Sequence, residues 1–270
     1  MVERIAQIAG LTPRSADSTA NRYFTFLLCF KDRVESQVTV ALVDRLTGWL
    51  SRRTRLSVIA DMMTDSPRSK PTLTGFFEDC RPEIVARQIK TLRIGPYDWH
   101  PSRPASIYFY LKNEHLTGDT FMVSGLKLLT ISIGKNIWDA RGGADTDFRS
   151  SLEEFFVTQG GHYGFGHERQ FMISGPFDRL EEKFEGSPLR VCDIDYRERI
   201  PGIYRYNYFS PQLLRHISGV ESLGEINGIT CRRFGDGVAA QESLVLEVER
   251  FEPNVIAQLT SRLGPLLQAG

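Results

Sequence analysis

The chain lacks the features that identify secreted and membrane proteins. No stretch of its 270 residues approaches the roughly 18 consecutive apolar residues of a membrane-spanning helix. Residues 1–7 lack the basic region and continuous apolar run of a signal peptide. We therefore expect a cytoplasmic protein that has no contact with a membrane.

A net charge is also lacking, because 33 Lys and Arg residues balance 33 Asp and Glu residues. The chain as a whole therefore has no bulk attraction to nucleic acid. Neutrality mildly favours association with another protein. A basic residue interleaves with aromatic ones at Tyr204-Arg205-Tyr206, which could suggest a nucleic-acid platform. Because the chain has no excess of basic residues, we interpret these tyrosines as one face of a packed sheet.

Cysteine is scarce and dispersed. The four cysteines are far apart and form no CxxC motif: Cys29, Cys80, Cys192 and Cys231. This spacing argues for a reducing compartment rather than a disulfide framework. Cys29 and Cys231 lie in apolar, strand-like settings, where a buried reduced thiol is expected.

Sequence motifs of common enzyme classes are missing. The chain contains no GxSxG, HExxH, Walker-type phosphate loop or glycine-rich dinucleotide fingerprint. The pairs Gly142-Gly143 and Gly160-Gly161 lack the flanking lysine or spacing of a phosphate loop and are expected to be turns. We therefore predict neither a cofactor nor an enzymatic activity.

Two groups of residues leave a metal-dependent hydrolytic enzyme open as an alternative. His162 and His167 are five residues apart, which fits no usual zinc spacing and puts them on opposite faces of a strand. Asp193 and Asp195 share one face of an extended segment and could help to hold Mg²⁺ or Ca²⁺. The simpler interpretations are a structural histidine pair beside a glycine bulge and a solvated acidic edge.

The best-specified local structure is at residues 204–219. Aromatic residues at positions 204, 206 and 208 alternate with polar ones, as in a strand with one buried face. Ser210 is a good helix N-cap, and Pro211 is tolerated in the first turn of a helix. Apolar positions then continue to Ile217, and Gly219 is a plausible stop.

Further elements follow from periodicity. Apolar runs predict strands at residues 23–30, 56–59, 107–111, 162–167, 229–234 and 238–241, with a strand or short helix at 126–133. Helical spacing predicts helices at residues 35–53, 148–158, 177–184 and 253–267. A further helix is expected to begin near residue 74 or 82 and to end at residue 92. Residues 64–72 and 94–104 are expected to be irregular.

These elements predict an α+β fold, with a mostly antiparallel sheet flanked by helices. Residues 1–21 are expected to be a flexible lead-in, and residues 22–270 a single domain. Two similar strand–helix lobes, at about 22–145 and 146–270, could be an old duplication.

Three stretches resemble the type VI secretion immunity protein family. They are the aromatic strand FTFLLCF at 24–30, GHYGF at 161–165, and PGIYRYNYFSP at 201–211 leading to GVESL at 219–223 and the turn at 235–237. The resemblance spans residues 22–268. The sequence departs from the family at Tyr206, where a tryptophan is common before the asparagine.

The resemblance implies a single immunity-type domain that binds a cognate effector toxin one to one and blocks its active site. Inhibitors of nuclease effectors are among similar proteins, and a nuclease presents a basic groove that an acidic projection would complement. We therefore predict that an acidic stretch contributes to the interface, through Glu181, Glu182, Glu185, Asp193, Asp195 and Glu198.

Overall fold

The computed structural model describes most of the strands and the C-terminal third of the chain. The described residues are 23–30, 41–42, 45–46, 49, 56–62, 68–70, 89–96, 107–112, 127–140, 146–169, 196–235, 237 and 242–267. The expected lead-in at 1–21 and the expected helix at 177–184 lie outside these ranges.

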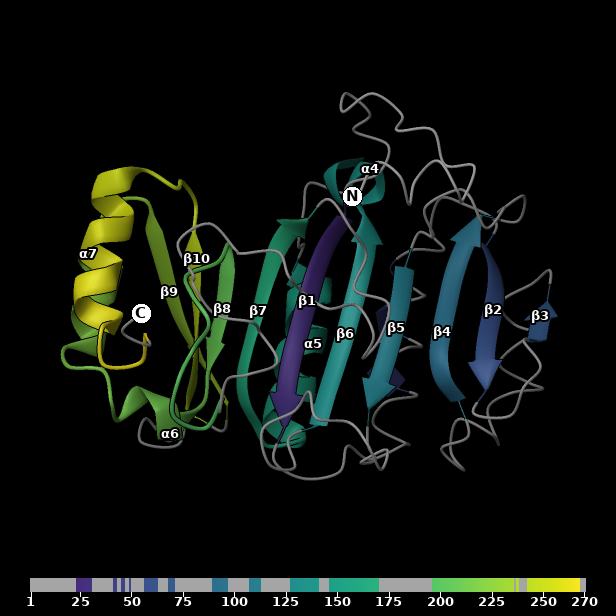
Figure 1. Cartoon of the computed structure of the whole chain (residues 1–270), viewed down its shortest axis with the longest axis horizontal. Coiled ribbons are helices and arrows are strands. Elements are labelled where there is room, and N and C mark those ends of the chain that lie inside the picture. Colours follow the sequence, from purple (N-terminus) through teal and green to yellow (C-terminus); the bar gives the residue numbers. More distant parts are fainter. Residues whose placement is uncertain are drawn as a thin grey trace, which may run out of the picture.

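Ten strands form one sheet, with every neighbouring pair antiparallel (Figure 1). The strands are β1 (Tyr23–Phe30), β2 (Leu56–Met62), β3 (Arg68–Lys70), β4 (Ile89–Pro96), β5 (Ile107–Lys112), β6 (Lys127–Gly134), β7 (Gly161–Arg169), β8 (Tyr206–Phe209), β9 (Ile229–Phe234) and β10 (Ser243–Val248). Their order across the sheet is β3-β2-β4-β5-β6-β1-β7-β8-β10-β9. The predicted α+β class with a mostly antiparallel sheet is confirmed. Both predicted lobes contribute strands to this sheet, and their duplication stays a prediction.

Strand β1 lies in the interior of the sheet, between β6 and β7. Its residues from Phe24 to Phe30 are all buried, as the nearly all-apolar run predicts for a strand covered on both faces. Phe26 and Phe30 pack against aromatic side chains of the helix α5 (Thr146–Thr158), whereas Leu27 and Cys29 belong to the core on the opposite face.

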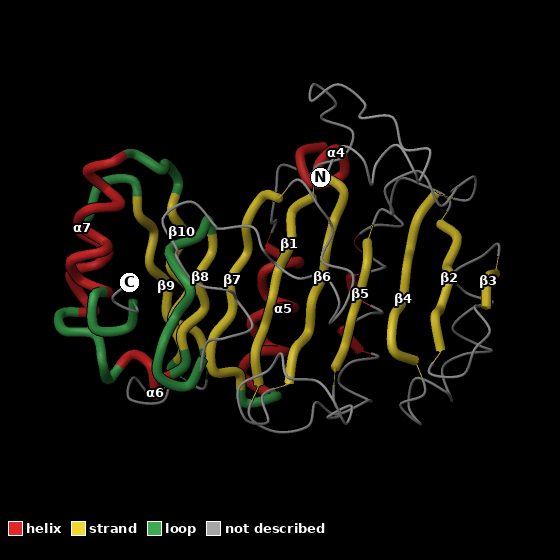
Figure 2. The backbone as a smooth tube through the Cα atoms, viewed as in Figure 1, coloured by secondary structure: helices red, strands yellow, loops and turns green. Residues whose placement is uncertain are grey.

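Helices cover the two faces of the sheet at different strands (Figures 1 and 2). Helix α5 lies behind the middle of the sheet, together with α4 (Lys135–Ala140), and helix α7 (Pro253–Leu263) covers the other face near the C-terminal edge. Beside α7, that face also carries the short helix α6 (Pro211–Leu214) and the 3-10 helix η4 (Val220–Glu225).

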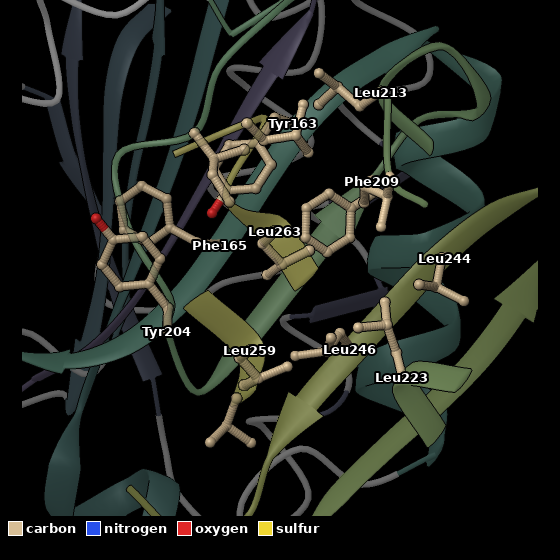
Figure 3. Close-up of a cluster of buried hydrophobic side chains, with 14 of the residues drawn as sticks. Tyr163, Phe165, Tyr204, Phe209, Leu213, Leu223, Leu244, Leu246, Leu259 and Leu263 are labelled. Atoms are coloured by element: carbon tan, nitrogen blue, oxygen red, sulfur yellow. The ribbon is translucent and has the colours of Figure 1, made fainter. Parts of the chain in front are cut away.

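The core under α7 joins residues that are far apart in sequence (Figure 3). Phe165 of β7 stacks on Tyr204 with ring centroids 4.1 Å apart, and Tyr163 stacks on Tyr196 at 5.6 Å. Aliphatic side chains from β10, α6 and α7 fill the space between them: Leu213, Leu244, Leu246, Leu259 and Leu263.

The predicted strand-to-helix motif at residues 204–219 is confirmed in part. Ser210 caps α6, because its hydroxyl accepts a hydrogen bond from the Leu213 amide at 3.3 Å. The predicted single buried face is wrong, because Tyr204 precedes β8 and packs on the α7 side, whereas Tyr206 and Tyr208 face α5. Helix α6 ends at Leu214 and not near Ile217, and Gly219, with a φ of 68°, precedes η4.

Several boundaries in the N-terminal half differ from the predictions. Residues 68–70 of the expected loop form β3, and residues 89–92 of the expected helix belong to β4, which also takes in residues 94–96 of the expected irregular segment. Strand β4 pairs with β2 and β5, so pairing across the sheet overrides the local helical spacing. The ambiguous segment at 126–133 is strand β6, and α4, which follows it, was not predicted.

In the C-terminal half, the predicted helix at 148–158 is confirmed as α5, which ends at Thr158, and Gly160 follows with a φ of 62°. Strand β9 is also confirmed, and it pairs with β10. The expected strand at 238–241 lies outside the described residues. Helix α7 begins at Pro253 as expected and ends at Leu263, four residues before the predicted end at 267.

Candidate functional site

The structure describes only one of the six acidic residues predicted to bind a partner. Glu198 is exposed in a turn that follows Tyr196. The other five lie outside the described residues: Glu181, Glu182, Glu185, Asp193 and Asp195. The acidic interface therefore stays a prediction.

The two histidines of the alternative metal site lie on β7 in different surroundings. His162 is buried, and its carbonyl accepts a hydrogen bond from the Ser210 amide at 3.0 Å. The ring of His167 lies edge-on between Tyr204 at 5.8 Å and Phe251 at 5.4 Å. The described ranges contain no group of three or more His, Cys, Asp or Glu residues that could hold a metal ion. A site at Asp193 and Asp195 stays a prediction.

Both described cysteines are free thiols whose ionisation is suppressed. Burial raises the pKa of Cys29 well above its usual range. Burial, and secondarily the negative charge of Glu221, raises the pKa of Cys231 to about 11. Since the thiolate is the reactive form, neither cysteine is suited to act as a nucleophile near neutral pH.

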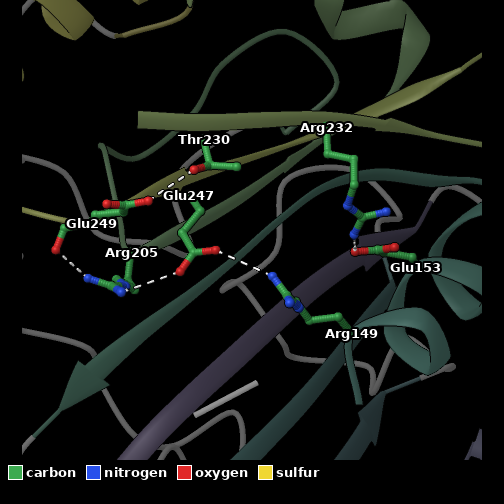
Figure 4. A network of polar contacts seen from close by, with 7 residues as sticks. All are labelled: Arg149, Glu153, Arg205, Thr230, Arg232, Glu247 and Glu249. Carbon is green, nitrogen blue, oxygen red and sulfur yellow. Dashed lines mark hydrogen bonds and ion pairs between the residues drawn. The ribbon is translucent and has the colours of Figure 1, made fainter. Parts of the chain in front are cut away.

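A network of ion pairs lies where α5 meets the C-terminal strands (Figure 4). We call it the arginine–glutamate cluster, and its residues are Arg149, Glu153, Arg205, Arg232 and Glu247. Arg149 and Glu153 are four residues apart and therefore lie on one side of α5. Arg232 of β9 and Glu247 of β10 point to the same face of the sheet. Glu247 pairs with Thr230 of β9, and Thr230 is two residues before Arg232, so the three side chains share that face.

Charges in this cluster alternate in space. Glu247 lies between Arg205 at 3.3 Å and Arg149 at 3.6 Å, and Arg232 is paired with Glu153. Arg205 also donates to the Glu249 carbonyl at 2.5 Å. The arginines are accessible, with side-chain exposures of 35% for Arg149 and 47% for Arg232, whereas Glu153 is only 6% exposed. A partner would therefore meet guanidinium groups before carboxylates.

Two tyrosines of β8 lie on the same face of the sheet as Glu247, since Tyr206 pairs with Glu247 and Tyr208 is two residues further along the strand. Burial, reinforced by the charge of Glu247, raises the pKa of Tyr206 to about 12. Burial also raises the pKa of Tyr208 well above its usual range, with a further contribution from Glu153. Both side chains are therefore neutral phenols at physiological pH and can donate a hydrogen bond.

Sequence reasoning did not find this cluster. Its members come from α5, β9, β10 and the residue before β8, and the Arg232–Glu153 pair spans 79 positions. The available signals were the i, i+4 pair on α5 and the tyrosines that flank Arg205. Neither signal identifies the oppositely charged residue with which each side chain pairs.

A recess lies between α5 and the helical residues Ala41, Leu42 and Arg45. It has a volume of about 270 Å³ and is lined by Ala41, Leu42, Arg45, Ser151, Glu154, Phe155 and Thr158. Arg45 and Glu154 form an exposed ion pair across it. The pairing raises the pKa of Arg45 and lowers the pKa of Glu154, and the hydrogen bond between the two side chains is the main cause of both shifts.

No helix in the described part of the chain is both long enough and apolar enough to span a membrane. Comparison of the sequence with protein-family models and with curated proteins finds no match.

The fold is similar to that of a solved protein of Pseudomonas aeruginosa, the T6SS protein PA0821, where T6SS denotes the type VI secretion system. The TM-score is 0.61 at 11% sequence identity, and the match covers 99% of this chain and 83% of that chain. At this identity the likeness concerns the fold. The chain therefore shares its overall fold with a T6SS protein.

Proposed function

We propose that this chain is a type VI secretion immunity protein, which binds a cognate effector toxin in the cytoplasm and blocks its active site. The observation that carries the proposal is the likeness in fold to a T6SS protein over 99% of the chain. The three stretches that resemble the immunity family support it, since they build β1, β7, β8 and the turn between β9 and β10.

The proposed mechanism is surface complementarity without catalysis, metal or cofactor. The ten-stranded sheet supplies a large scaffold, and its tyrosines and glycines serve mainly to pack it. A stable complex of this kind buries at least about 1,200 Å² and depends on a few anchor residues. A toxin bound in this way loses access to its substrate.

The acidic stretch at 181–198 is the proposed contact for a basic, nuclease-like substrate groove. We expect the double variant Asp193→Lys and Asp195→Lys to weaken toxin binding at least about tenfold, because it replaces attraction by repulsion at the contact. The measurement is isothermal titration of the purified toxin domain with each form of the protein.

The matched control is Glu225→Lys, which changes the charge of an exposed residue of η4, outside the acidic stretch. Glu225→Lys should bind like the wild type. Unchanged binding by the double variant would remove this stretch from the interface and leave the immunity function intact.

A further inference from the structure

Strand β9 forms one edge of the ten-stranded sheet (Figure 1). Among the described residues its only strand neighbour is β10, with which it pairs over six residues without a bulge. Thr230 and Arg232, on the face of β9 that looks toward α5, are exposed. An edge strand presents backbone N–H and carbonyl groups to which a further strand can bond.

The hydrogen-bond pattern of β9 shows which backbone groups point outward. The Glu249 amide donates to the Gly228 carbonyl at 3.0 Å, so bonding toward β10 recurs at every second residue from there, at Thr230 and Arg232. The residues between them point their N–H and carbonyl groups away from β10. Cys231 is therefore an outward-facing residue, and in the described part of the chain no backbone group bonds to it on that side.

This edge lacks the usual devices that keep strands from joining. The strand contains neither a proline nor a bulge. Its two cations are already held in ion pairs, Arg232 with Glu153 and Arg233 with Glu221, so they repel an incoming strand less than bare charges would. The chain as a whole also carries no net charge, which favours association.

The sequence of β9 restricts how a second copy of the chain can add to this edge. In antiparallel pairing about a two-fold axis, outward-facing residues of one copy must meet outward-facing residues of the other. Registers centred on Arg232 or Arg233 set like charges directly opposite each other, which is destabilising. A register centred on Thr230 needs the Ile229 amide at its centre, and that amide already donates to the Ile226 carbonyl at 3.0 Å. A register centred on Cys231 has neither fault.

We propose that two copies of this chain pair antiparallel along β9, about a two-fold axis at Cys231, and so join their sheets into one. Each Cys231 N–H donates to the Cys231 carbonyl of the other copy. Arg232 of one copy lies opposite Thr230 of the other, a neutral and exposed side chain. Pairing along one short strand is a small contact, so the dimer is reversible. The inference depends on the sheet and not on the proposed function, and it stands or falls apart from toxin binding.

The test is sedimentation equilibrium of the purified full chain over a range of concentrations, in which the wild type should show a monomer–dimer equilibrium. Cys231→Pro removes the outward N–H and should be monomeric, yet it should remain folded, since proline is tolerated where an edge strand points its N–H to solvent. Cys231→Ser is the matched control, because it keeps the N–H, and it should dimerise like the wild type.

A second pair of variants tests the register without changing the backbone. Thr230→Lys puts a cation opposite Arg232 of the other copy at both ends of the contact and should weaken dimerisation about fivefold. Thr230→Val, its neutral control, should change the dissociation constant less than twofold. Both substitutions are at an exposed position, so both variants should fold.

A wild-type chain that stays monomeric at every concentration would overturn the proposal, whether the edge then remains open or receives a strand of another protein. Wild-type dimerisation in both Cys231→Pro and Thr230→Lys would overturn it too, because the dimer would then form through another surface. If Cys231→Pro fails to fold, as circular dichroism would show, the comparison of Thr230→Lys with Thr230→Val decides.

Discussion

Replacing Asn207 by alanine is expected to destabilise the fold by about 3–5 kcal/mol, because it removes the buried hydrogen bonds that this side chain makes with the Tyr204 backbone and the Tyr163 hydroxyl. Asn207 is fully buried, and its Oδ1 accepts from the Tyr204 amide at 3.1 Å and from the Tyr163 hydroxyl at 3.3 Å. Its side-chain amide donates to the Tyr204 carbonyl at 2.8 Å. The residue therefore fixes the chain where it enters β8. A loss of this size is a large share of the roughly 5–15 kcal/mol that stabilises a typical domain.

The measurement is urea unfolding followed by circular dichroism, with Asn227→Ala as the matched control. Asn227 is exposed in the turn before β9, so its truncation should change the free energy of unfolding by less than about 0.5 kcal/mol. If Asn207→Ala unfolds at the same urea concentration as Asn227→Ala, the side chain of Asn207 does not fix the chain where it enters β8.

Replacing Gly164 by valine is expected to prevent stable folding, because β7 has no room for a side chain there. A Cβ atom at Gly164 would lie 2.4 Å from the Leu28 Cδ2 atom and 3.1 Å from the Leu27 carbonyl oxygen. Leu28 is fully buried in β1 and cannot move aside freely. Overpacking by a single methylene already costs about 1–3 kcal/mol, and valine adds three carbon atoms.

Thermal unfolding of the purified variant checks this expectation, with Gly224→Ala as its control. A Cβ at Gly224 meets its nearest neighbour, the Cys231 Cβ, at an ordinary 3.7 Å, so that variant should melt like the wild type. Adding Leu28→Ala to Gly164→Val should recover part of the stability, since it vacates the space that the valine needs. A wild-type melting temperature in Gly164→Val alone would contradict the close packing of β1 on β7.

The sequence predicted well those elements that carry their own local signals. The nearly all-apolar run of β1, the serine and proline that begin α6, and the proline that begins α7 all act within a few residues. Strands β3 and β4 were missed because pairing with β2 and β5 decides their conformation. Tyr204 was put on the wrong face because β8 begins only at Tyr206.

The arginine–glutamate cluster could not be predicted from the sequence, for a similar reason. The partner of Arg149 is on β10 and the partner of Arg232 is on α5, so only the assembled sheet brings the charges together. No local pattern distinguishes these arginines from ordinary surface residues. The acidic stretch, in contrast, was predicted from the sequence, through its composition and the family resemblance. Of its six residues, only Glu198 lies within the described residues.

The central claim is that this chain protects a cell by binding one toxin. The most direct measurement looks first for an effector gene with a C-terminal toxin domain beside this chain's gene, and then follows the survival of cells that express that toxin domain with and without the chain. Co-expression should restore growth, and the two purified proteins should form a one-to-one complex in which the toxin is inactive. Continued killing despite a folded, expressed chain, or turnover of a substrate by the isolated chain, would contradict the claim.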